Sequence, residues 1–533
     1  MPLYDSEVSF VLQIVIFILP FKSNYRVPIT SKKLNIIALI SALPVSLAIQ
    51  MVDTPFTWFM YVLVIFTFIE ATPKEAFKRA LLIGISAAVI NFFWFLSSTQ
   101  KFTGKGILLG VGIMVIFAIL FALYAGLLGS ISTALRWKKN NKWTWLFNAL
   151  ILSSLWALFD GFMIYVAKSF SLCMYVTYIS FADNLYAIQP TSIFGPLVIT
   201  FVVVFANYAA AHFIYYRQWK MLPIPFAVIG GYLLFGYFIY NSFQNKIDND
   251  DHKLPPVKVA IIAENLLPEY QWDSTYGNQL AKAMFELNRR VAASGANIAV
   301  WSESAVPWNY TPDDDFLKEV DKITSPANVT HLVGMNTDYQ GRTFYNSIYC
   351  MAPGRKILGR YDKRVALSLI EKPFLGMLLP FFNTSGFRVK EGTNNQPFVT
   401  PYGKIGMMLC NESVVTQPIY SSVQNGAQFL VNPGNDGWFT TTYLAKQHYF
   451  HARLRAVETR KDVVINNNNG YTGMVKAIGE ISLKDKSLEA YIATVTVSPN
   501  DYISFSVLHQ YFFLTICIVL LISLFFFNIQ SKK

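Results

Sequence analysis

The chain has 533 residues, of which 53% are hydrophobic and only 14% are charged. This balance excludes a disordered protein and indicates a protein with long membrane-embedded segments. The formal net charge of +12 is carried largely by short basic clusters between apolar runs, a pattern that membrane topology explains better than nucleic-acid binding does.

Several apolar runs are long enough to cross a bilayer, which takes about 20 helical residues. A shorter run, 8–21, is either a ninth crossing or an interfacial helix. The first residues, MPLYDSEVSF, lack a basic n-region and a cleavage site, so we expect the whole chain to be mature protein. The sequence predicts eight crossings: 34–51, 55–71, 80–98, 106–135, 144–166, 192–216, 222–241 and 507–528.

Lysine and arginine gather in every second loop between these runs. Short basic loops stay on the cytoplasmic side of a membrane, so this alternation predicts the orientation of the chain. The long segment between the 222–241 and 507–528 runs then lies on the outer side. The basic residues are Lys22, Arg26, Lys32, Lys33, Lys74, Lys78, Arg79, Arg136, Lys138, Lys139, Lys142, Arg217, Lys220, Lys532 and Lys533.

The outer segment has the composition of a soluble α/β domain. Short β-branched runs such as VKVAIIA, THLVGMN and AQFLVNPGN alternate with polar or helical stretches, and 275–294 has the pattern of an amphipathic helix. We therefore expect a polytopic α-helical membrane bundle plus an extracytoplasmic α/β domain. The predicted division is a bundle over 1–245, a catalytic domain over 255–502 and a C-terminal transmembrane helix over 507–528.

Three of the predicted strands end in residues that could work together. Glu303 follows IAVW, Lys363 follows ILGRYD and Cys410 follows IGMML. A thiol must lose its proton as it attacks a carbonyl, and a buried carboxylate such as Glu303 can accept that proton. The tetrahedral intermediate carries a negative oxygen, which the Lys363 ammonium and a backbone N–H can stabilise.

Each of these residues also has an ordinary structural interpretation. A lone cysteine at a strand end is more often a small buried apolar residue, and a lysine or glutamate in a loop is usually solvated. The cysteines show neither zinc-site spacing nor a disulfide framework, so at most one is chemically active. They are Cys173, Cys350, Cys410 and Cys517.

The surrounding motifs resemble the nitrilase superfamily in the order Glu, Lys, Cys. AVWSESAVPW resembles its glutamate motif, GRYDKR its lysine motif, and GKIGMMLCNES with NPGNDGWF its cysteine region. More narrowly, the motifs QHYFHARLRAVETR and NNGYTGMV, and the helices on both sides of the α/β domain, are similar to the bacterial apolipoprotein N-acyltransferase family. This resemblance implies an αββα sandwich for 255–502.

The resemblance also implies roles for individual residues. Glu303 matches the general base, Lys363 the oxyanion-stabilising lysine and Cys410 the acylated nucleophile. Two supporting carboxylates of the family match Glu371 and Glu412. Trp272, in EYQWDS, matches a tryptophan that lines the lipid pocket, although an ordinary partly buried aromatic residue explains it as well.

The implied reaction moves an acyl chain from a phospholipid, typically phosphatidylethanolamine, through a Cys410 thioester to the amine of a diacylglyceryl-cysteine on an apolipoprotein. No metal or organic cofactor and no nucleic acid takes part, and a monomer is expected. The implied location is the bacterial cytoplasmic (inner) membrane, with the catalytic domain on the periplasmic side. The rival hypotheses are a membrane-tethered amidase of the nitrilase type and a catalytically dead, lipoprotein-binding scaffold.

Two segments depart from the family pattern. RVALSLI follows Lys363 where the family has a Pro-Phe-Gly stretch, and Asn411 follows Cys410 where an aromatic residue is common. The apolar segment 364–390 is a candidate for a mobile cover over the site, or it belongs to the core.

Overall fold

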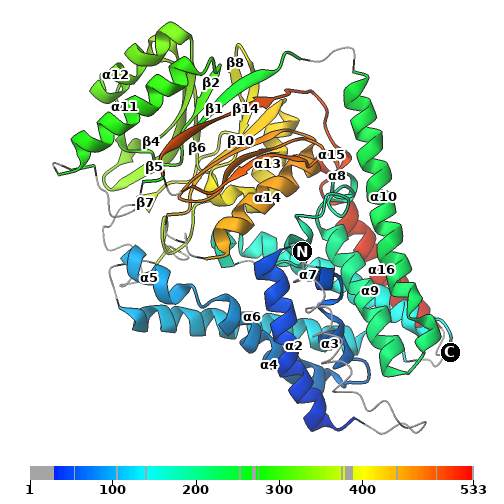
Figure 1. The fold of residues 1–533 in the computed structure, drawn as a ribbon. Coiled ribbons are helices and arrows are strands. Elements are labelled where there is room, and N and C mark those ends of the chain that lie inside the picture. The colour runs from blue at the N-terminus through cyan, green and yellow to red at the C-terminus, as the bar shows by residue number, and fades with distance from the viewer. Residues whose placement is uncertain are drawn as a thin grey trace, which may run out of the picture.

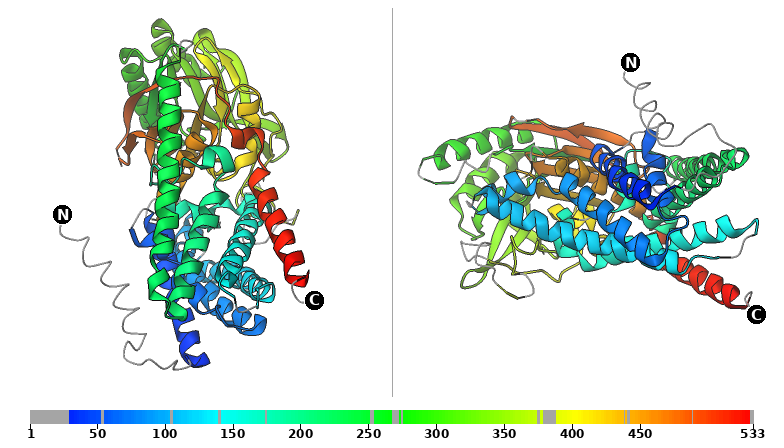
Figure 2. Two further views of the ribbon diagram at one scale, coloured as in Figure 1. Left: turned by 90° about the vertical axis from the view of Figure 1, so that its right-hand side faces the viewer. Right: turned by 90° about the horizontal axis from the view of Figure 1, so that it is seen from below.

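A computed structural model shows a helical bundle with an α/β domain at one end of it (Figures 1 and 2). It describes residues 29–52, 55–103, 106–138, 141–173, 175–250, 254–266, 272–273, 275–373, 376–377, 388–437, 439, 442–487 and 489–530. The apolar run 8–21 lies outside these residues.

The bundle consists of the helices that precede the α/β domain and of α16, which follows it. Within the described residues, five helices are long and apolar enough to cross a membrane: Ser31–Met51, Ile107–Ala134, Thr144–Val166, Leu197–Tyr215 and Trp219–Asp248. On α6 (Ile107–Ala134), Leu108, Ile116 and Leu120 are each more than half exposed. Apolar side chains that face outward along a helix of this length are suited to contact with lipid. Besides α6, the bundle consists of α2 (Ser31–Met51), η1 (Pro55–Phe59), α3 (Val62–Phe66), α4 (Pro73–Asn91), α5 (Phe95–Thr103), α7 (Thr144–Val166), η2 (Lys168–Cys173), η3 (Thr177–Phe181), α8 (Thr191–Phe194), α9 (Leu197–Tyr215), η4 (Trp219–Met221), α10 (Pro223–Asp248) and α16 (Phe512–Gln530).

Four of the eight predicted crossings are not single continuous helices. The 55–71 run breaks between η1 and α3, and the 80–98 run is split between α4 and α5. The 192–216 run begins in α8 and continues in α9, and the 507–528 run begins in α15 (Phe505–Leu508) and continues in α16. At the first break, the side chain of Asn207 on α9 accepts a hydrogen bond from the Tyr61 N–H and donates one to the Trp58 carbonyl, at 3.0 and 2.7 Å. A polar group of a neighbouring helix thus satisfies the interrupted backbone, which hydropathy cannot reveal.

The first sheet of the α/β domain has the strand order β14-β1-β2-β4-β5-β6, with β3 beside β4 and β7 beside β5. Strands β1, β2 and β4 run parallel, whereas β14, β5 and β6 are antiparallel to their neighbours. Its strands are β1 (Val257–Ala263), β2 (Ile298–Val300), β3 (Val306–Asn309), β4 (Thr330–Gln340), β5 (Thr343–Ala352), β6 (Lys356–Asp362), β7 (Arg388–Val389) and β14 (Tyr491–Val497).

The second sheet has the order β13-β12-β11-β10-β9-β8. Its central strands β9, β10 and β11 run parallel, so their carboxyl ends meet at one edge. Its strands are β8 (Phe398–Thr400), β9 (Gly403–Met407), β10 (Phe429–Asn435), β11 (Val463–Asn468), β12 (Thr472–Val475) and β13 (Ile481–Asp485).

The two sheets pack face to face and a pair of helices covers each outer face. Ile261, Val300, Ile405 and Val431 lie in the core between the sheets. Helices α11 (Gly277–Ala293) and α12 (Asp315–Thr324) cover the first sheet, while α13 (Thr416–Gln424) and α14 (Leu444–Thr459) cover the second. The predicted αββα sandwich is therefore confirmed, and α11 corresponds to the amphipathic helix predicted at 275–294.

The two outer helical layers differ in their surroundings. Helix α11 buries one face and exposes the other, whereas every residue of α14 except Lys446 is buried. One apolar core continues from α14 into the bundle and includes Tyr449 together with Tyr178. The α/β domain therefore contacts the bundle through α14. The edge of the second sheet at which β9, β10 and β11 end lies near the bundle.

Candidate active site

The nucleophile candidate, Cys410, begins a short 3-10 turn just after β9. Its φ of +52° is a left-handed conformation that costs a non-glycine residue free energy and is held by its surroundings. The Asn432 side chain donates to the Cys410 carbonyl at 3.3 Å and to the Met408 carbonyl at 2.9 Å. Gly434 on β10 lies against this turn, and a Cβ at that position would lie 3.3 Å from the Cys410 Cα. A side chain at position 434 would therefore crowd the turn.

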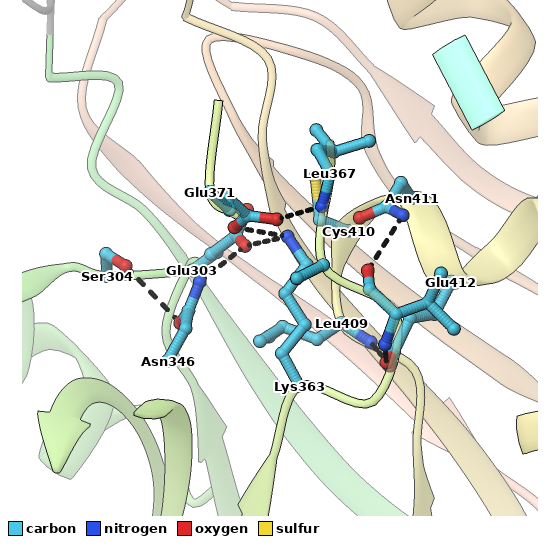
Figure 3. Close-up of polar contacts among 12 residues, drawn as sticks. Glu303, Ser304, Asn346, Lys363, Leu367, Glu371, Leu409, Cys410, Asn411 and Glu412 are labelled. Carbon is cyan, nitrogen blue, oxygen red and sulfur yellow. Dashed lines mark hydrogen bonds and ion pairs between the residues drawn. The ribbon is translucent and has the colours of Figure 1, made fainter. Parts of the chain in front are cut away.

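Lys363 lies at the centre of the charged group shown in Figure 3. Its Nζ is 2.9 Å from Glu303 Oε1 and 2.8 Å from Glu371 Oε1, and it is 1% exposed. The structure thus brings Glu303, Lys363, Glu371 and Cys410 together from four separate segments. The ammonium is buried between two carboxylates, which keeps it charged and fixes its direction.

Asn346 on β5 connects the base candidate to the lysine. Its Nδ2 donates to Glu303 Oε1 at 2.9 Å, and its carbonyl accepts from the Lys363 N–H at 2.8 Å. The sequence analysis identified this segment only as a strand. A signal was present, because Asn346 is a polar residue that interrupts a buried strand.

Glu412 has a different role from Glu371, because it binds the backbone rather than the lysine. Its carboxylate accepts hydrogen bonds from the Tyr361 hydroxyl and the N–H groups of Leu409, Arg364 and Val365 at 2.6 to 3.0 Å. Burial raises the pKa of Glu412 above its ordinary value, against the opposing effect of these donors. Glu412 thereby holds the segment after Lys363 against the turn that carries Cys410.

Burial and nearby charge together determine the state of the thiol. Burial raises the pKa of Cys410 well above its ordinary value and the Glu303 carboxylate raises it further, while Lys363 and the Asn435 N–H lower it. Burial would lower the pKa of Lys363, but Glu303 and Glu371 outweigh it, so the pKa is raised. At neutral pH the resting site holds a neutral thiol beside an ammonium ion, and the thiol needs a base to react.

Several known proteins are similar to this chain in sequence. A family model described as carbon-nitrogen hydrolase matches residues 258–503, and one described as apolipoprotein N-acyltransferase N-terminal domain matches residues 41–209. Proteins named apolipoprotein N-acyltransferase are 24% identical in Vibrio parahaemolyticus (84% of this chain, 88% of that protein) and 26% in Shewanella oneidensis (80% and 82%). A match at 27% in Geobacter metallireducens covers 42% of this chain and less than half, 45%, of that protein.

The chain is similar to apolipoprotein N-acyltransferases over most of its length. It is a membrane protein and an acyltransferase, with a helical bundle followed by an α/β domain of the carbon-nitrogen hydrolase type. Among the described residues, no group of three or more His, Cys, Asp or Glu side chains is placed to hold a metal ion. The expectation that the reaction needs no cofactor stays a prediction.

Trp272 is not among the residues that contact the charged group. Its ring packs edge-on against Trp308 and Phe316, at 5.2 and 5.4 Å, beside the core under α11 and α12. Residues 267–271 and 274 are outside the described part of the chain. Its predicted role as a wall of the lipid pocket stays a prediction.

The candidate cover segment, 364–390, is only partly described. Val365, Ala366 and Leu367 are buried, so this part of 364–390 belongs to the core in the structure. The Leu367 N–H donates to Glu371 Oε2 at 2.7 Å and thereby holds the carboxylate that faces Lys363. Most of 374–387 lies outside the described residues.

The membrane half supplies an apolar wall next to this segment. Trp94, at the break between α4 and α5, packs with Leu367, Phe439 and Leu444 in one buried cluster. The carbonyl of Asn91, at the end of α4, accepts a hydrogen bond from the Tyr443 hydroxyl of the α/β domain at 2.7 Å. The segment around Asn91 and Trp94 therefore lies at the junction of the two halves.

Proposed function

We propose that the chain is an apolipoprotein N-acyltransferase that uses Glu303, Lys363 and Cys410 as base, oxyanion-stabilising cation and nucleophile. The single observation that carries this proposal is the Lys363 ammonium held between Glu303 and Glu371 beside Cys410. The donor is a membrane phospholipid, with phosphatidylethanolamine as the expected substrate. The acceptor is the α-amine of the diacylglyceryl-cysteine at the N-terminus of an apolipoprotein.

In the first half-reaction Glu303 accepts the Cys410 thiol proton while Sγ attacks the ester carbonyl of the phospholipid. The carbonyl oxygen becomes negative, and the Lys363 ammonium stabilises that charge without having to reorient. The ester C–O bond then breaks, and Glu303 returns the proton to the departing oxygen. A lysophospholipid leaves, and the acyl chain remains on Cys410 as a thioester.

In the second half-reaction the acceptor amine attacks the thioester carbonyl. A new C–N bond forms, the C–S bond breaks, and the amine proton passes through Glu303 to the Cys410 sulfur. The apolar cluster of Trp94, Leu367, Phe439 and Leu444 supports this step, because an acyl chain needs such a surface and water would hydrolyse the thioester.

The proposal also includes the placement of the protein. The basic loops support a bundle in the bacterial inner membrane with the α/β domain on the periplasmic side. The working division is 1–245 for the bundle, 255–502 for the catalytic domain and 507–528 for the C-terminal helix. The expected assembly is a monomer.

The test is to incubate detergent-purified protein with phosphatidylethanolamine and to measure its intact mass. We expect an acyl adduct on the wild type that hydroxylamine removes, that a diacylated peptide with a free amine consumes, and that is missing from Cys410→Ala. If the wild type stays unmodified with several phospholipids but hydrolyses soluble amides, the tethered amidase replaces the acyltransferase. If it shows neither reaction, the scaffold hypothesis replaces it.

A further inference from the structure

A second candidate binding site lies where α10 passes the α/β domain. Figure 2 shows α10 running from the bundle up alongside that domain. A cavity of about 380 Å³ opens there between α10, the end of α8, the residue that ends α14 and the segment 502–505 that leads toward α16. Four segments from both halves of the molecule therefore enclose one space.

The cavity is apolar at one end and cationic at the other. Phe238 on α10 is 59% exposed, and Ile503 and Phe505 face the same space. Lys246 and Arg460 line it as well. Phe238 and Lys246 are two turns apart on α10, about 12 Å along the axis. The apolar residue is on the bundle side and the lysine on the side away from it.

Both cations have neutral partners. Lys246 Nζ lies 4.3 Å from the Tyr502 ring centroid, and the Arg460 guanidinium lies 4.4 Å from that of Phe243. Arg460 donates to the Gln189 side-chain oxygen, the Ser192 hydroxyl and the Ala477 carbonyl. Among the described residues, neither cation forms a salt bridge with a carboxylate.

Neither cation is therefore neutralised by a direct ion pair within the described residues. Asp250 accepts a hydrogen bond from the Tyr502 hydroxyl at 2.7 Å, and Asp501 precedes that tyrosine in the chain. Arg460 is 4% exposed, and burial lowers its pKa to about 9. A bound anion would relieve this cost, because an ion pair favours the charged form of the arginine.

We propose that this cavity binds the headgroup of an anionic membrane phospholipid, with its phosphate at Lys246 and Arg460 and its acyl chains along Phe238 and Phe505. The apolar-to-cationic order along α10 matches the order from acyl chain to phosphate in a bilayer leaflet. A free phosphate would satisfy the cations but leave the apolar end exposed.

This site is separate from the active site. Arg460 ends α14. Near the other end of α14, His448 binds Asp436, whose charge acts on Cys410. Twelve helical residues, about 18 Å of axis, separate Arg460 from His448. The lipid would thus tie α10 to the α/β domain without being the acyl donor, and its binding does not depend on the proposed reaction.

The test is native mass spectrometry of the full chain carrying Cys410→Ala, so that acyl transfer cannot consume lipid. The protein is offered equal amounts of phosphatidylglycerol and phosphatidylethanolamine. We expect preferential retention of one phosphatidylglycerol. Lys246→Gln should weaken that retention about tenfold, as expected for one lost charge-assisted contact. Ser242→Trp, on the exposed α10 face that lines the cavity, should block it by filling the space.

The matched control is Lys220→Gln, an exposed cation just before the opposite end of α10. It should keep the retention of the parent protein. The proposal is overturned if Ser242→Trp retains phosphatidylglycerol like the parent, or if Lys220→Gln loses as much as Lys246→Gln. It is also overturned if inorganic phosphate raises the melting temperature as much as phosphatidylglycerol does, since the cavity would then be an anion site without lipid selectivity.

Discussion

Cys350 and Cys410 are both buried in the α/β domain, but their surroundings differ. Cys350 lies inside β5, paired with Leu332 and Gly359, in the core between the sheets. Burial alone raises its pKa to about 12. Cys410 lies after the end of β9, and burial raises its pKa as well, but there Glu303 and Lys363 act on the thiol.

The difference indicates that position along a strand, and not burial, separates the proposed nucleophile from a packing cysteine. A residue inside a strand is committed to both neighbouring strands and to the core. A residue after the end of a strand can adopt an unusual backbone conformation, here a φ of +52°, and can meet charges from other strand ends. Four experiments test this comparison, from the largest expected effect to the smallest.

The largest effect is expected when the thiols of Cys410 and Cys350 are removed one at a time and the two variants are compared. Cys410→Ala should lower the rate of acyl transfer about 10⁴-fold or more, as for the loss of a nucleophile. Cys350→Ala should keep the rate per folded molecule within about twofold, because it alters only packing. The measurement is the transfer of a labelled acyl chain to a diacylated peptide. Equal losses in the two variants would contradict the comparison.

Glu303→Gln tests whether the thiol needs the base beside it. We expect acylation to slow by about 10² to 10⁴-fold, which is the usual contribution of general base catalysis. The control is Glu319→Gln, which removes a carboxylate of α12 that pairs with the exposed Lys322. Single-turnover acylation, followed by intact mass, measures both. A Glu303→Gln variant as fast as the control would exclude Glu303 as the base.

The pH dependence of alkylation tests the charges around Cys410. Because the thiol pKa is raised, the thiolate fraction and the rate with iodoacetamide should grow with pH and not level off below pH 9. Lys363 lowers this pKa, so Lys363→Met should reduce the rate several-fold at each pH. The exposed Lys322→Met is the control. A plateau near neutral pH, or faster alkylation of Lys363→Met, would contradict the assignment.

The smallest effect on activity is expected from Cys350→Ser. A hydroxyl without a partner in the core between the sheets should destabilise the protein by about 1 to 3 kcal/mol, with little change in acyl transfer per folded molecule. Cys350→Ala is the matched variant, since it removes the sulfur without adding a polar group. Melting followed by tryptophan fluorescence compares them. A serine variant as stable as the alanine variant would mean that the position is not a dry core.

Much of the architecture was predictable because it depends on local sequence patterns. The apolar runs at 106–135, 144–166 and 222–241 correspond to α6, α7 and α10, and the β-branched runs of 255–502 correspond to strands. The 55–71 run failed as a continuous helix because its break is stabilised by Asn207, a residue distant in the sequence. Hydropathy averages over neighbours in the chain and does not register such a contact.

The sequence by itself determined the candidate set Glu303, Lys363 and Cys410, because each residue follows a recognisable strand and stands in a motif with a family resemblance. Only the tertiary structure decided the partners: Glu371 binds the lysine, while Glu412 binds backbone N–H groups and Tyr361. It also added Asn346 and placed Trp272 beside Trp308. The physical reason is that strand ends follow from local periodicity, whereas contacts between segments depend on sheet register and on how the two halves of the molecule pack.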